Sequence, residues 1–81
     1  MNTTNITNYS DENVLKFKRT FNSGLFKKGE IIIYHEGNFG DEVSARTMQG
    51  KVMRELYEAG KVHLYQKKIG FERFVYMAEV R

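Results

Sequence analysis

Residues 31–34 place the strongest constraint on the fold, because three isoleucines and a tyrosine in succession leave the segment without a polar face. β-Branched and aromatic residues favour strands, and Gly29 and Gly37 bound this run. A strand that is apolar on both faces is typical of a covered, central position in a sheet. We therefore expect further strands beside it and other elements packed over it.

The 81-residue chain is expected to form one domain with a thin core, since a chain this short buries only ~60% of its unfolded surface. It has no cysteine, which excludes disulfides and cysteine-based zinc sites and favours an intracellular, cytoplasmic setting. Residues 1–9 are small and polar, with neither a signal-peptide pattern nor a membrane-spanning run, and are expected to form a flexible tail. The net charge of +3 permits nucleic-acid binding without requiring it.

Apolar periodicity predicts two helices. The first covers residues 11–23, with Ser10 as its N-cap and an apolar stripe at positions 14, 17 and 21. The second covers residues 45–59, with Ser44 as its N-cap, Gly60 after its end, and Gly50 on its outer face. Residues 61–69 and 72–81 read as a strand pair with Gly70 in the turn. The predicted class is α+β, with two helices on a three-stranded antiparallel sheet over residues 10–81.

The sequence offers no recognisable catalytic or metal site. Its two histidines, His35 and His63, lie in different predicted strands, and no carboxylates have metal-ligand spacing. There is no phosphate-binding glycine loop and no nucleophile motif. We therefore expect a protein that is not an enzyme and that uses no metal or cofactor.

The second predicted helix carries its bases near its start, in Arg46, Lys51 and Arg54, and has Glu55 and Glu58 behind them. The helix dipole favours the opposite order. One interpretation is an anionic ligand near the amino terminus, where backbone N–H groups and arginines can both bind phosphate.

The second interpretation is an ordinary solvated face. In that case Arg46 pairs with Asp41 or Glu42, and Lys51 pairs with Glu55. The hairpin adds weight to the first interpretation, because further polar and basic residues gather around its tip at positions 66, 67, 68 and 73. A basic helix followed by a basic hairpin suits a helix in the major groove and a hairpin on the adjacent backbone.

Two stretches, VSARTMQGKVMRELYEAGKVHLYQKK and FVYMAEVR, resemble the last helix and wing of winged helix-turn-helix regulators. The segments SGLFKKGEIIIYHEG, GKVHLYQKK and YMAEVR resemble a group of small phage and prophage proteins with a YH-x-G strand and a G-K/R-V-H-L-x-Q hairpin. These resemblances imply a winged-helix-like fold, a viral or prophage origin and a place in the cytoplasm of a bacterial host cell.

The resulting expectation is a small phage or prophage protein that binds duplex DNA with a helix and a basic β-hairpin, as a transcriptional regulator does. The residues expected to contact nucleic acid are Ser44, Arg46, Thr47, Gln49, Lys51, Arg54, Gln66, Lys67, Lys68 and Arg73.

Two alternatives stay open. The interval before Ser44 is too short for the scaffold helix that normally precedes a recognition helix. The same winged-helix-like fold can instead bind a protein partner, as a phage-encoded module that inhibits a host defence complex, in the manner of an anti-CRISPR. The last strand, residues 74–81, can also pair with a second copy if it lies at the edge of the sheet, which would give a homodimer.

Overall fold

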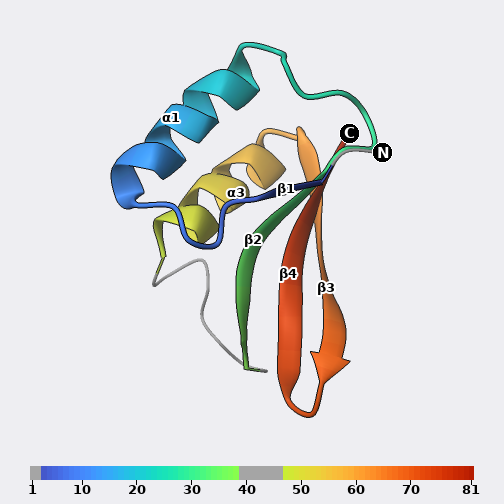
Figure 1. Ribbon diagram of the computed structural model, residues 1–81. Helices are drawn as coiled ribbons and strands as arrows, with labels where there is room; N and C mark the ends of the chain where they lie inside the picture. Colours follow the sequence, from blue (N-terminus) through green and yellow to red (C-terminus); the bar gives the residue numbers. More distant parts are fainter. Residues whose placement is uncertain (1–2, 39–46) are drawn as a thin grey trace.

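The computed structural model describes residues 3–38 and 47–81, which form a four-stranded sheet and two helices (Figure 1). Both helices lie on the same face of the sheet. The elements along the chain are β1 (Thr3–Asn5), α1 (Asp11–Asn22), β2 (Ile31–Asn38), α3 (Met48–Glu58), β3 (Val62–Gly70) and β4 (Arg73–Val80). The α+β class with two helices is confirmed for the described residues.

The sheet has the strand order β1-β2-β4-β3 and is mixed. β1 pairs in parallel with β2, whereas β4 pairs antiparallel with both β2 and β3. The prediction of a three-stranded antiparallel sheet is wrong because Thr3–Asn5 adds a parallel strand outside β2. β4 has a neighbour on each side, so its backbone is not at an edge and cannot pair with a second copy as expected from the sequence.

The first residues of the chain are part of this fold, although they read as a flexible tail in the sequence. Ile6 follows β1, is fully buried, and donates its backbone N–H to the carbonyl of Ile33 (2.9 Å). The side-chain oxygen of Asn5 accepts bonds from the N–H and hydroxyl of Thr7, at 2.9 and 2.7 Å. These bonds turn the chain from the sheet towards α1 and bring Ile6 into the core.

α1 confirms the helix predicted from the sequence, and its end lies within one residue of the predicted one. The Ser10 side chain accepts a bond from the N–H of Asn13 (3.3 Å), as an N-cap does. Val14, Phe17 and Phe21 form the buried stripe.

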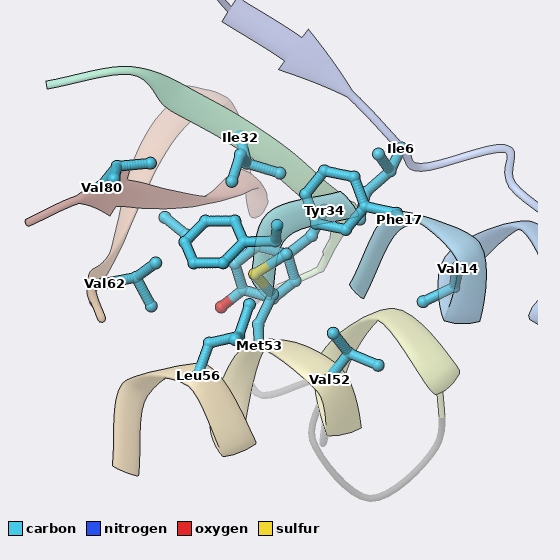
Figure 2. Packing of buried hydrophobic residues seen from close by; sticks show 12 residues of the cluster. Ile6, Val14, Phe17, Ile32, Tyr34, Val52, Met53, Leu56, Val62 and Val80 are labelled. Carbon is cyan, nitrogen blue, oxygen red and sulfur yellow. The ribbon is translucent and has the colours of Figure 1, made fainter. Parts of the chain in front are cut away.

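The core lies between the two helices and the covered face of the sheet (Figure 2). Ile32 and Tyr34 of β2 meet Val52, Met53 and Leu56 of α3 there. Burial raises the pKa of Tyr34 to about 12, with the nearby Tyr76 adding to the effect.

The opposite face of the sheet is covered by neither described helix (Figure 1). Ile31 and Ile33 alternate with the buried Ile32 and are only half-buried. The expectation that β2 is covered on both faces is therefore wrong for the described residues.

The β3–β4 hairpin is the longest pairing of the sheet and extends past the helical layer (Figure 1). Its base belongs to the core through Val62, Ala78 and Val80. Towards the tip, every residue of β3 from Tyr65 to Gly70 is exposed. The hairpin thus has a buried half that anchors it and a free half that reaches into solvent.

Candidate nucleic-acid interface

α3 begins three residues later than the sequence suggested, which changes the position of the predicted basic helix start. Thr47 is the N-cap, and its hydroxyl accepts a bond from the N–H of Gly50 (2.9 Å). The expectation of Ser44 as N-cap is wrong, because Thr47 has the extended backbone and the capping bond that this position requires. Ser44 and Arg46 lie outside the described residues.

The first turn of α3 contains no acidic residue, and the last contains no basic one. Gly50 is buried, not on the outer face as expected, because the buried arc of α3 is wider than the predicted stripe and also includes Gln49 and Met53. The unusual charge order is therefore carried, within the described helix, by Lys51 and Arg54.

Gln49, expected at the nucleic-acid interface, is instead buried with 8% of its surface exposed. Its side-chain nitrogen donates to the carbonyl oxygens of Ile6 and Tyr9, both at 3.1 Å, and lies 3.4 Å from that of Thr7. The side chain thus ties α3 to the segment that follows β1. It is engaged in the fold and is not presented to a ligand.

Lys51 and Arg54 lie on the solvent side of α3. Arg54 has a long contact with Glu58 (3.9 Å), whereas Glu55 accepts from Lys18 of α1 (2.7 Å). The pairing of Lys51 with Glu55, which the solvated-face interpretation predicted, is thus replaced by a bond between the two helices. No described carboxylate pairs with Lys51.

The polar residues near the hairpin tip lie on two different faces. Val62 and Leu64 point to the core, so Gln66 and Lys68 continue on the helix side of the sheet. Lys67 lies on the opposite side, together with Tyr65. Neither lysine forms an ion pair with a described carboxylate.

Arg73, the fourth predicted residue of the hairpin, already has a partner. Its guanidinium donates to the carboxylate of Glu36 on the neighbouring strand β2. Both side chains of this pair are well exposed. Such surface pairs contribute only ~0.2–1 kcal/mol, so an anionic ligand can take over the guanidinium at little cost.

The tip also carries two apolar side chains that the sequence reading did not select. Phe71 is 87% exposed and Ile69 is 48% exposed. Phe71 and Glu72 form the turn between the strands, where Gly, Asn, Asp and Ser are the usual residues. The signal was present in KKIGFER, as an aromatic residue directly after the turn glycine.

Comparison with known proteins adds no family or function. No protein-family model matches the chain, and no curated protein or solved structure is significantly similar to it. Neither described helix has the length and apolar character needed to cross a membrane.

Within residues 3–38 and 47–81, no group of histidine and carboxylate side chains is arranged to hold a metal ion. The His35 ring packs against Tyr76, with 5.4 Å between ring centroids. His63 lies opposite Glu79 in the β3–β4 register.

Proposed function

We propose that this protein binds duplex DNA and that the free half of the β3–β4 hairpin makes the principal contact. The observation that carries the proposal is the placement of Lys67 and Lys68 on opposite faces of a projecting ribbon. Both are exposed and have no ion-pair partner among the described carboxylates.

The physical fit follows from the shape of DNA. Two-stranded ribbons can enter either groove of duplex DNA, and each groove has a phosphate backbone along each wall. A ribbon with one cation on each face can reach both walls at once. A flat acidic protein surface would instead be matched by cations that share one face.

α3 supplies the second contact in this proposal. Lys51 and Arg54 are exposed on the helix, and Arg73 can exchange Glu36 for a phosphate. A winged-helix-like arrangement, with α3 as the recognition helix and the hairpin as the wing, is the finer form of the proposal. A phage origin and a regulatory role follow from the sequence resemblance and belong to the same proposal.

The test is a fluorescence-anisotropy titration of a labelled 20-bp duplex, repeated between about 50 and 200 mM salt. If Lys67 and Lys68 each neutralise a phosphate, replacing both with alanine should reduce the log–log salt slope by about 1.8 and weaken binding. The matched control is Lys27→Ala with Lys28→Ala, another adjacent exposed pair, which lies directly before Gly29, a residue bonded to Val80 at the base of the hairpin and so far from its tip.

Both double variants remove two positive charges, so a comparison of the two separates direct phosphate contact by the hairpin from general electrostatic attraction to DNA. Equal losses for both would mean that only net charge matters and would remove the hairpin from the proposal. Absence of duplex binding by the unaltered protein at the lowest salt would reject DNA binding as the function.

A second candidate function, binding to a host protein complex, is favoured by a different surface. The uncovered face of the sheet carries a row formed by the half-buried Ile33 and Met77 and the exposed Tyr65, because Ile33 pairs with Met77 and Met77 pairs with Tyr65. A partner retained from host lysate after nuclease treatment, and lost on Met77→Lys, would support an inhibitor or adaptor role. Retention that disappears with nuclease would instead favour DNA.

A further inference from the structure

We propose that Phe71 is an apolar wedge that enters between neighbouring base pairs of bound DNA and kinks the duplex. This inference rests on the proposed function and names the residue that would deform the ligand. Among the described residues, Phe71 is the most exposed large apolar side chain. It lies at the end of the hairpin, far from the helices that cover the core (Figure 1).

Nothing in the fold requires a phenylalanine at this position. Phe71 is absent from the core cluster and from the aromatic pairs of the described residues, whereas Phe17, Phe21 and Phe26 pack together around α1. A two-residue turn is better served by small polar residues. Phe71 and the half-exposed Ile69 together give the tip an exposed apolar group outside the core, and such a group suits a binding partner that buries it.

The neighbouring charges identify the partner as a polyanion. Three cationic side chains, Lys67, Lys68 and Arg73, lie near the tip with two carboxylates, Glu72 and the Glu36 that pairs with Arg73, which leaves the two lysines without an ion-pair partner among the described residues. The two lysines flank the ribbon on opposite faces, so phosphates on both sides can hold the tip against the stacked bases. The half-exposed Ile69, two residues before Phe71 in the chain, gives the tip a second apolar group.

Wedges of this kind are Phe, Leu, Ile, Met or Pro side chains that enter from the minor groove and kink DNA by about 20–90°, so the tip is expected to bind in the minor groove. The kink costs least at flexible pyrimidine–purine steps such as TA. We therefore expect Phe71 to favour duplexes with such a step at the centre of the site. The hairpin cations would set the salt dependence of binding, whereas the ring would set the bend.

The experiment uses the full chain and a 20-bp duplex with a central TA step. The duplex carries a donor and an acceptor dye at its ends and, in a second preparation, 2-aminopurine at the step. Saturating protein should raise energy transfer, because the ends approach, and should raise 2-aminopurine fluorescence, because the base unstacks.

Phe71→Ala should abolish both signals and weaken binding by about 5- to 140-fold, the range given by loss of one base–aromatic contact. Its salt slope should equal that of the unaltered protein. Phe71→Leu keeps an apolar wedge and should keep the bend. Lys67→Ala with Lys68→Ala should show the converse, with a reduced salt slope and an unchanged bend once saturated.

The outcomes separate this inference from the proposed function. Duplex binding without a Phe71-dependent bend overturns the wedge and leaves DNA binding in place. No duplex binding, combined with Phe71-dependent sedimentation on phosphatidylserine-containing vesicles, overturns both and makes the tip a membrane-inserting loop. Because Phe71 is exposed, thermal unfolding of the variants should match that of the unaltered protein, which excludes misfolding as a cause.

Discussion

Gln49→Leu should destabilise the protein although it introduces an apolar residue into a buried site. The Gln49 amide donates to the carbonyl oxygens of Ile6 and Tyr9, both at 3.1 Å, and so holds the segment after β1 against α3. Leucine fills a similar volume and donates nothing. The Tyr9 carbonyl then loses its bond, whereas that of Ile6 keeps the one from the Tyr9 N–H (3.1 Å).

The magnitude follows from the number of bonds lost. Two hydrogen bonds at a net ~0.5–1.5 kcal/mol each give a loss of about 1–3 kcal/mol. An 81-residue domain has a total free energy of unfolding of about 4–12 kcal/mol, so the loss is a large fraction of it. A loss of about 2 kcal/mol should lower Tm by roughly 8–16 °C for a domain of this size.

The assay is urea unfolding followed by circular dichroism, with Gln66→Leu as the matched control. Gln66 is exposed on the free half of β3, and the same substitution there should change the unfolding free energy by less than ~0.5 kcal/mol. Equal stabilities of the two variants would refute the structural role assigned to Gln49.

Gln49→Glu provides an independent check through pH. A buried carboxylate facing carbonyl oxygens is unfavourable, so the folded state should raise its pKa above the usual value of about 4.3. The protonated acid can donate one bond, so this variant should be closest to the unaltered protein below about pH 4. Its deficit should grow as the pH rises towards the folded-state pKa. A deficit independent of pH would show that the site is open to water.

Two further predictions concern Tyr34 and Glu72. The pKa of Tyr34 is raised to about 12 by burial, so the contribution of its neutral phenol to stability is complete below about pH 10 and is lost as the pH rises through 12. In urea unfolding, the Tyr34→Phe variant should therefore lose less stability between pH 8 and 11 than the unaltered protein. Equal losses in the two proteins would contradict this. Glu72 has a φ of 55°, a backbone conformation that costs a non-glycine residue about 1–2 kcal/mol. Glycine removes this cost but increases the entropy of the unfolded chain, which takes back about 0.4–1 kcal/mol. Glu72→Gly should therefore stabilise the protein by about 0.5–1 kcal/mol, and Glu72→Gln, which removes the charge and keeps the backbone strain, should not.

The parts of the fold that follow from local patterns were predictable. α1 combines a serine cap, acidic residues in its first turn and apolar residues at helical spacing, and all of these act within a few residues of one another. The strand pair at the end of the chain is equally local, since its register follows from a short turn and alternating side chains. The second helix was predicted correctly in type but not in its start, because Ser44 and Thr47 are both good caps.

The parts that depend on distant contacts were not predictable in the same way. β1 is three polar residues long and pairs with β2, nearly thirty residues further along the chain. Its one sequence signal is Ile6, an isolated apolar residue in a polar stretch. Gln49 is buried only because Ile6, Thr7 and Tyr9 present carbonyl groups to it, and no pattern within α3 predicts those partners.

For the candidate site, the sequence contained the needed information, but charge alone does not show on which face of a strand a residue lies. The basic residues of the hairpin were identified by charge, yet neighbouring residues in a strand point to opposite faces, so Lys67 and Lys68 cannot bind an anion from the same face of the hairpin. Because of the same alternation, the hairpin presents one lysine on each of its two faces. Phe71 was overlooked because charge, not exposure, guided the selection.

The base of the hairpin contributes to the stability of the fold, whereas its tip carries the proposed binding surface. Val62 and Val80 at the base are buried in the core, whereas Lys67, Lys68 and Phe71 near the tip pack against no core residue. Large changes in stability come from cavities, unsatisfied polar groups or lost caps, and substitutions at the tip create none of these. Altered binding by a tip variant can therefore be attributed to its surface rather than to its fold, because the backbone ladder between β3 and β4 carries the tip.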